Sequence, residues 1–166
     1  HLSLRRQRQM CKETDLELHI LGREASALNL LQQLREQGTA RVQLPFGDAH
    51  LAELPDGPLV LIAAGTGMAQ MHSLIEECRS RGFQHPVHLY WGARRPEDFY
   101  QLPHWDEWQA LPNLFLHQVV SDQCGWQGRC GLLHEAVRED FADLRALHVY
   151  ASGSPSMVYA TLDALV

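Results

Sequence analysis

Apolar residues are distributed differently before and after residue 55, and the second part has the clearer pattern. Its run at 59–64 (Leu-Val-Leu-Ile-Ala-Ala) contains no polar residue, which is typical of a parallel strand covered on both faces. Three further runs have the length of a strand and follow at 87–91, 114–120 and 147–151. We therefore expect four strands in this part of the chain.

Helical spacing separates these strands. Met71, Leu74, Ile75 and Cys78 follow the i, i+3, i+4, i+7 pattern, which predicts a helix over 68–81 ended by Gly82. Helical spacing recurs at 131–137 and 141–147. The alternation of strands and helices predicts the α/β class, with a doubly wound parallel sheet. The turn-forming sequence at 54–58 (Leu-Pro-Asp-Gly-Pro) separates this domain, residues 55–166, from residues 1–54.

The front part, residues 1–54, carries a sparser pattern. Alternation at 16–20 predicts a half-buried strand, and apolar spacing from Ser26, a candidate helix N-cap, predicts a helix through Leu34. A second short strand is expected at 40–44, before the turn-rich sequence at 45–48. Two strands and one helix are too few to close a barrel, so we expect this part to be incomplete.

Charge and hydropathy exclude two classes of partner. The chain has 20 acidic against 14 basic residues, a net charge of −6, which leaves no electrostatic footprint for nucleic acid. No apolar run approaches the roughly 20 residues that span a bilayer, and the first residues do not resemble a signal peptide. We therefore predict a soluble, cytoplasmic protein with no membrane partner.

The cysteines and histidines predict neither a disulfide framework nor a metal site. Cys11, Cys78, Cys124 and Cys130 are widely spaced and form no C-x-x-C pair, so we expect four reduced thiols. His72 and Cys78 share one predicted helix but are six residues apart, which is not the spacing of helical metal ligands.

Small, polar or cationic residues follow each predicted strand. In a doubly wound sheet the ligand lies beyond the carboxyl ends of the strands, near the topological switch point. We therefore expect one site formed by four loops: Gly65-Thr66-Gly67, Gly92-Ala93-Arg94-Arg95, Ser121-Asp122-Gln123 and Ser152-Gly153-Ser154-Pro155-Ser156-Met157.

Each loop also has a purely structural interpretation. Glycines at 65 and 67 let a backbone approach a phosphate at a helix N-terminus, but they equally suit a tight turn that needs a positive φ. Arg94 and Arg95 could hold a phosphate, or they could be solvated surface arginines. Ser154-Pro155 before an apolar stretch is also an ordinary helix start. The tryptophans are expected to be core and loop anchors, and no G-x-S-x-G nucleophile elbow is present.

Taken in order, these motifs resemble the ferredoxin–NADP reductase-like superfamily. The resemblance is greatest to bacterial NAD(P)H–flavin reductases and to the reductase components of oxygenases. The matching segments keep the family's order and spacing and lie at 61–69, 88–94, 119–121, 125–131 and 150–157. Gln70 replaces the proline that the family carries after the Gly-Thr-Gly turn.

The resemblance implies an oxidoreductase that takes hydride from NAD(P)H to the N5 position of a flavin. Electrons would then pass to free flavin, an iron–sulfur protein or an oxygenase. Asp122 would repel a 2′-phosphate, which favours NADH over NADPH. The implied nucleotide-binding residues are Gly65, Thr66, Gly67, Gly92, Arg94, Arg95, Ser121, Asp122, Gly153, Ser154, Pro155 and Met157.

The front part resembles the end of the family's flavin-binding β-barrel, with Leu44-Pro45-Phe46-Gly47 at the closing motif. Ser3 and Ser26 are the implied contacts to FAD or FMN. The family's R-x-Y-S flavin motif would fall near residues 1–3, where only Ser3 fits, and we expect most of the barrel to lie upstream of residue 1. A second hypothesis is therefore a degenerate nucleotide-binding or interaction module without turnover.

Overall fold

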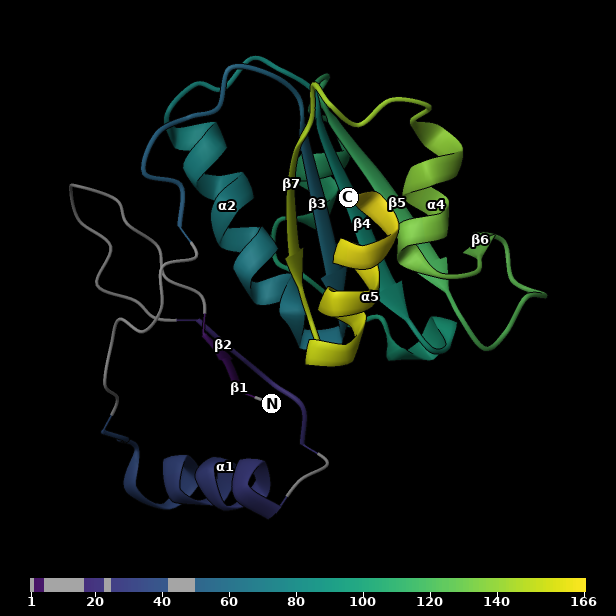
Figure 1. Cartoon of the computed structure of the whole chain (residues 1–166). Coiled ribbons are helices and arrows are strands. Elements are labelled where there is room, and N and C mark those ends of the chain that lie inside the picture. The colour runs from purple at the N-terminus through teal and green to yellow at the C-terminus, as the bar shows by residue number, and fades with distance from the viewer. Residues whose placement is uncertain (1, 5–16, 23–24, 42–49) are drawn as a thin grey trace.

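The computed structural model describes residues 2–4, 17–22, 25–41 and 50–166. A parallel sheet of five strands in the order β6-β5-β4-β3-β7 forms the centre (Figure 1). The strands are β3 (Leu59–Ala64), β4 (Val87–Ala93), β5 (Leu114–Val120), β6 (Arg129–Cys130) and β7 (His148–Ser152). β3 lies between β4 and β7, so the chain reverses its direction of strand addition there.

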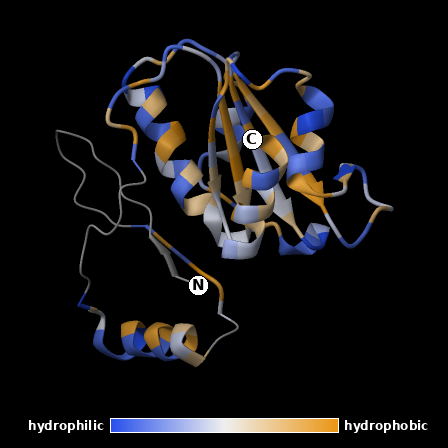
Figure 2. Cartoon of the chain, viewed as in Figure 1, coloured by the Kyte–Doolittle hydropathy of each residue, from blue (hydrophilic) through white to orange (hydrophobic). Residues whose placement is uncertain are grey.

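Helices cover both faces of this sheet, with α2 on one side and α4 and α5 on the other (Figure 1). Figure 2 shows strongly apolar central strands between helices of mixed character. One apolar cluster joins the sheet to α2 and α3, and a second joins it to α4 and α5. The helical elements are η1 (Gly65–Gly67), α2 (Met68–Ser80), η2 (Pro96–Asp98), α3 (Trp105–Gln109), α4 (Leu133–Asp140) and α5 (Pro155–Leu165). The predicted doubly wound α/β sheet is confirmed.

The predicted helix at 141–147 is wrong. Phe141 adopts extended backbone angles and ends α4. The Asp143 carboxylate accepts a hydrogen bond from the Arg145 backbone N–H, which favours a turn over a helix. Phe141, Leu144 and Leu147 still pack on the second apolar cluster. Their three-residue spacing therefore reflects burial in a loop.

The front part contains β1 (Leu2–Leu4), β2 (Leu18–Ile20) and α1 (Ala25–Gln37). β1 and β2 pair antiparallel, with Ser3 opposite His19. The predicted strand at 16–20 is confirmed at 18–20, whereas Glu17 is not in a strand and Leu16 lies outside the described residues. Ser26 is not an N-cap, because α1 already begins at Ala25. Residues 40 and 41 are not in a strand, and the rest of the predicted strand and turn, 42–48, lies outside the described residues.

Candidate nucleotide-binding site

The four loops singled out from the sequence meet at one edge of the sheet. All the sheet's strands are parallel, and the loops follow the carboxyl ends of β3, β4, β5 and β7. The reversal at β3 creates the switch point between β3 and β7, where an open α/β sheet leaves a crevice for a ligand. The Gly65–Gly67 turn and the Ser152–Met157 loop flank that point.

Two glycines in the first turn are required for different reasons. Gly65 has a φ of +53°, is exposed, and has no atom within 4 Å of the position that a Cβ would occupy. Gly67 is buried, and a Cβ there would lie 2.6 Å from the Ser152 carbonyl carbon and still closer to its oxygen. Gly65 therefore supplies a left-handed turn with open space above it, while Gly67 lets the turn pack against the end of β7. The open space at the start of α2 fits the pyrophosphate of a dinucleotide.

Trp91, near the carboxyl end of β4, packs against this turn and donates a hydrogen bond to it. Its side chain is 2% exposed, and the indole Nε1–H donates to the Gly65 carbonyl oxygen at 3.4 Å. The ring packs against Phe99, Tyr100 and Trp105, with centroids 5.0 to 5.6 Å apart. Trp91 is thus a core anchor, as predicted for the tryptophans.

The loops after β4 and β5 run side by side beyond the strands. The Ser121 N–H donates to the Ala93 carbonyl at 3.1 Å, and the Asp122 N–H donates to the Arg94 carbonyl at 3.0 Å. The Ser121 hydroxyl donates to the Asp122 carboxylate at 2.5 Å. Arg94 and Asp122, which are both exposed, therefore lie on neighbouring, hydrogen-bonded segments of the chain.

Arg95 is held differently from Arg94. Its guanidinium lies 3.9 Å from the Glu97 carboxylate, and its backbone N–H donates to Asp98 at 3.2 Å. Exposed pairs of this kind stabilise a protein by at most about 1 kcal/mol. A phosphate could therefore compete with Glu97 for the Arg95 guanidinium.

The loop after β7 forms the start of α5. Ser154 is its N-cap and accepts a hydrogen bond from the Met157 N–H at 3.3 Å, and Pro155 occupies the first turn. A Cβ at Gly153 would lie 2.9 Å from the Ala64 Cβ and would also meet the Met157 methyl group. The helix-start interpretation is thus realised, with Met157 half-buried beside the end of β3.

Gly92 serves packing. A Cβ there would lie 2.6 Å from Leu133 Cδ1, so its missing side chain lets α4 approach β4 closely. Its contact with a nucleotide, which the family resemblance implies, stays a prediction.

The two candidate flavin contacts lie in the front part. Ser3 is in β1, and Ser26 is an exposed residue of α1. The described front part consists of two paired strands and one helix, which cannot close a barrel around a flavin. The described residues therefore do not make up a flavin site.

A contact that the sequence pattern did not reveal joins β2 to the sheet. His19 is 6% exposed, and its Nδ1 lies 2.6 Å from the Tyr100 hydroxyl while its Nε2 lies 2.9 Å from a Glu17 carboxylate oxygen. Burial, with the nearby Glu17 charge, raises the pKa of Tyr100, which keeps its hydroxyl protonated. Tyr100 also packs on Trp91, so β2 is connected to the residue that supports the Gly65 turn.

The prediction of four reduced thiols is wrong for two of them. Cys124 and Cys130 form a disulfide with a Cα–Cα distance of 5.0 Å, within the range that such bonds need. They are separated by a glycine-containing loop, which allows the two chain segments to approach. Cys78 is free and buried, and burial raises its pKa to about 11. Cys11 lies outside the described residues.

Two further observations concern metals and membranes. Within residues 2–4, 17–22, 25–41 and 50–166, no group of three or more His, Cys, Asp or Glu side chains could hold a metal ion. His72 is fully buried against the Trp108 ring, 4.7 Å between centroids. Among the described helices, none is long and apolar enough to cross a membrane.

A cluster of polar side chains connects α4 to strands β4, β5 and β6. The Tyr90 hydroxyl donates to Asp140 at 2.5 Å, and Arg129 of β6 also donates to Asp140. Burial opposes ionisation of Asp140, but the Arg129 and Tyr90 hydrogen bonds keep the pKa of its carboxyl below the usual value. The His117 ring stacks on Tyr90, 4.4 Å between centroids, and lies beside His88, 5.7 Å away.

This cluster predicts acid sensitivity below about pH 6.5. Burial, with the neighbouring His117 charge, lowers the pKa of His88 from 6.5, and burial lowers the pKa of His117 as well. As pH falls through 6.5, the unfolded chain takes up protons that the folded protein still resists, so the free energy of unfolding decreases. His117→Gln will flatten this dependence in urea unfolding series between about pH 5 and 8. Parallel curves for both proteins would contradict the assignment.

Comparison with known proteins supports the same class. Residues 61–163 match the family model of the oxidoreductase NAD-binding domain. An NAD(P)H-flavin reductase of Aliivibrio fischeri is 32% identical over 158 residues, which cover 91% of this chain and 67% of that protein. A Yersinia pestis CDP-6-deoxy-L-threo-D-glycero-4-hexulose-3-dehydrase reductase is 36% identical over 133 residues, 79% of this chain and 40% of that protein.

Solved structures agree with these relatives. The cytochrome reductase GcoB from Amycolatopsis superposes with a TM-score of 0.69 at 31% identity, over 78% of this chain and 41% of that one. The ferredoxin reductase in carbazole 1,9a-dioxygenase superposes with a TM-score of 0.54 at 27% identity, over 65% of this chain and 33% of that one. The fold and the strand-end loops define an oxidoreductase NAD-binding domain. The chain belongs to the ferredoxin–NADP reductase-like superfamily, and it spans between 40% and 67% of the two curated relatives above.

Proposed function

We propose that this chain binds NAD(P)H across the carboxyl ends of β3, β4, β5 and β7 and presents it for hydride transfer to a flavin. The observation that carries the proposal is the exposed, left-handed Gly65 at the switch point, with open space where a side chain would be. A nicotinamide nucleotide supplies the hydride. The protein's part is to bind and orient it.

The proposed roles follow the position of each loop. Gly65, Thr66 and the start of α2 receive the pyrophosphate through backbone N–H groups, while Gly67 holds their turn against β7. Arg94 and Arg95 bind the 5′-phosphate of the adenosine ribose, which NADH and NADPH both carry, and Ser121 with Asp122 meets the adenosine end. The remaining residues, next to the switch point, lie beside the nicotinamide: Gly153, Ser154, Pro155 and Met157.

We propose residues 55–166 as the nucleotide-binding domain and residues 1–54 as the part of a flavin domain that this chain carries. The electron acceptor belongs to the class that the relatives' names indicate: free flavin, or an acceptor protein such as a dehydrase or a dioxygenase component. A cytoplasmic location, where NAD(P)H is available, completes the proposal.

A second candidate function is a nucleotide-binding or interaction module without turnover. The observation in its favour is the sequence at residues 1–3, where only Ser3 fits the family's R-x-Y-S flavin motif. The two candidates differ in whether bound NADH is oxidised when a flavin acceptor is added. Both need the same nucleotide site.

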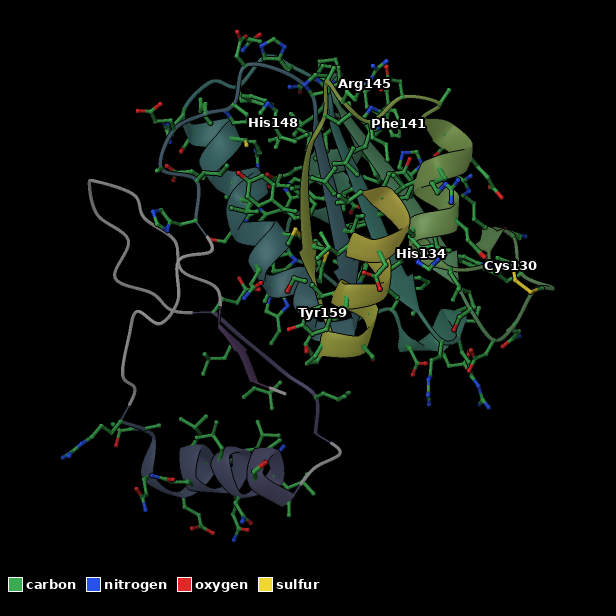
Figure 3. The ribbon with its side chains drawn as sticks, viewed as in Figure 1. Cys130, His134, Phe141, Arg145, His148 and Tyr159 are labelled. Carbon is green, nitrogen blue, oxygen red and sulfur yellow. A yellow bond between two sulfur atoms is a disulfide. The ribbon has the colours of Figure 1, made fainter. Side chains whose placement is uncertain are left out.

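The test of that site compares two arginines at opposite ends of the sheet. Arg94 directly follows the carboxyl end of β4, whereas Arg145 lies just before the amino end of β7, at the top of the view in Figure 3. In calorimetric titrations with NADH, Arg94→Ala will weaken binding about tenfold through loss of a charge-assisted hydrogen bond. Arg145→Ala, which removes an arginine paired with Asp143, will leave affinity unchanged. Equal effects of the two substitutions would refute this location.

Asp122 sets the preference for NADH over NADPH. Its carboxylate lies in the loop beside Arg94, and a negative charge there repels a 2′-phosphate. Asp122→Ser will raise the NADPH-to-NADH affinity ratio about tenfold. Asp56→Ser, at an exposed acid before β3 and thus at the other end of the sheet, serves as the control for net charge. If both variants change the ratio equally, Asp122 has no specific role.

A further inference from the structure

The Cys124–Cys130 disulfide lies directly beside the proposed adenosine end of the site. Cys124 comes two residues after Asp122, and the bond closes a short loop between β5 and β6, with a sequence separation of six. Figure 3 shows this bond on a loop that projects from the sheet edge. A change in the conformation of this loop would therefore act on residues that follow Ser121 and Asp122 directly in sequence.

The two cysteines of the disulfide, Cys124 and Cys130, are accessible to a thiol reagent, whereas the buried Cys78 is not. Cys124 and Cys130 are exposed residues. Cys78 is 3% exposed, and burial raises its pKa to about 11, so little reactive thiolate forms there near neutral pH. A thiol reagent would act on the exposed pair first.

The loop that the disulfide closes also contacts the segment after β4. The Trp126 Nε1–H donates to the Arg129 carbonyl at 2.9 Å, which folds the loop back on itself. The Trp126 ring stacks on Phe99, 5.7 Å between centroids at an interplanar angle of 30°. Phe99 directly follows η2, the turn next to Arg95. The loop thus connects the Ser121–Asp122 side of the site to the Arg94–Arg95 side.

β6 has anchors of its own, so opening the disulfide would not detach it. Arg129 pairs with Asp140 and, at 2.8 Å, with Glu139 on α4. The Gly131 N–H donates to the Val120 carbonyl at 3.0 Å. The residues between the cysteines include Gly125 and Gly128, which permit many backbone conformations once the ring is opened. Reduction would therefore loosen 124–128 and leave the sheet intact.

We propose that Cys124 and Cys130 form a reversible thiol–disulfide site that controls nucleotide affinity, a proposal that rests on the nucleotide site described above. A dithiol reductant attacks one sulfur, the S–S bond breaks, and two electrons and two protons yield two cysteine thiols and the oxidised reductant. A low-molecular-weight disulfide such as glutathione disulfide reverses the reaction. The closed loop keeps Trp126 on Phe99 and the adenosine side ordered, so the oxidised form binds NADH more tightly. A disulfide in a reducing compartment is usually redox-sensing or catalytic, which agrees with this role.

The test uses the double variant Cys11→Ser/Cys78→Ser, in which Cys124 and Cys130 are the only remaining cysteines. Oxidation by glutathione disulfide and reduction by dithiothreitol are verified by mass spectrometry, and NADH affinity is measured in each state. We expect binding at least about fivefold tighter in the oxidised state. A further Cys124→Ser substitution will fix the affinity at the reduced value under both treatments.

Three outcomes would overturn the proposal. Equal NADH affinity in the verified oxidised and reduced states would reject the control of binding but leave the nucleotide site standing. Failure of the two thiols to form an intramolecular bond under oxidation would reject the disulfide itself. Absence of NADH binding in both states, from folded protein, would reject the proposed function and this proposal with it.

Discussion

Replacing Gly67 with alanine will abolish measurable NADH binding and destabilise the fold. The added Cβ would lie 2.6 Å from the Ser152 carbonyl carbon and 2.9 Å from the Gly153 nitrogen, both backbone atoms that cannot rotate away. The turn and the end of β7 must therefore separate, at a cost of about 1–3 kcal/mol for overpacking. Because those two segments flank the switch point, the nucleotide site opens at its centre. Urea unfolding and calorimetric titration measure the two effects.

Two other glycines provide matched comparisons. Gly125→Ala meets no atom within 4 Å and needs no positive φ, so its stability and binding should equal those of the wild type. Gly65→Ala also meets no atom, but its φ of +53° costs an alanine about 1 kcal/mol. The expected order of damage is therefore Gly67, then Gly65, then Gly125. A Gly67→Ala protein that binds NADH normally would contradict the close approach of η1 to β7.

Replacing Trp108 with alanine will lower the free energy of unfolding by about 3–5 kcal/mol. The Trp108 side chain is fully buried in the apolar cluster between α2 and the sheet, where its removal leaves a cavity. Its indole Nε1–H also donates to the Glu76 carboxylate at 2.8 Å, and the substitution removes this hydrogen bond while the one from Arg79 at 2.8 Å remains. Denaturant unfolding with a constant m-value measures the loss.

Trp126→Ala is the control for loss of an indole ring. Trp126 is only half-buried and lies in the loop after β5, so we expect its removal to cost about 1 kcal/mol or less. Comparable losses for Trp108→Ala and Trp126→Ala would mean that Trp108 is not part of the core as described.

The centre of the sheet was predictable because β3 and β4 are buried along almost their whole length. The run at 59–64 became β3 with the predicted bounds, since every position there must be apolar. The parallel arrangement then follows from the alternation of strands and helices, and it alone brings the four loops to one edge. The gathering of Gly65, Arg94, Asp122 and Gly153 at that edge could thus be inferred without coordinates.

Other features depend on contacts between distant residues. β6 has only two residues, too few for a pattern, and is defined by its pairing with Val119 and Val120. His19 meets Tyr100 across 81 positions of sequence, and no local spacing signals such a contact. The Cys124–Cys130 bond depends on a loop that returns to β5.

The sequence alone could not tell which glycines of the site contact a ligand and which allow close packing. Gly65, Gly67 and Gly92 look alike in a strand-end motif, yet Gly65 supplies a positive φ, Gly67 a close approach to β7 and Gly92 a close approach to α4. Only the surroundings of each missing Cβ separate a residue facing open space from one that serves packing. Gly92 is thus explained by packing, and its contact with a nucleotide stays a prediction.

The most direct test of the nucleotide site is an NADH titration of the isotope-labelled wild-type chain followed through backbone amide chemical shifts. We expect saturable shifts at the carboxyl edge of the sheet, with none near Asp56, Arg145 or His148 at the opposite edge. Saturable shifts at that opposite edge, or no shifts from a folded chain, would contradict it. The residues expected to respond are Gly65, Thr66, Gly67, Arg94, Arg95, Ser121, Asp122, Gly153, Ser154 and Met157.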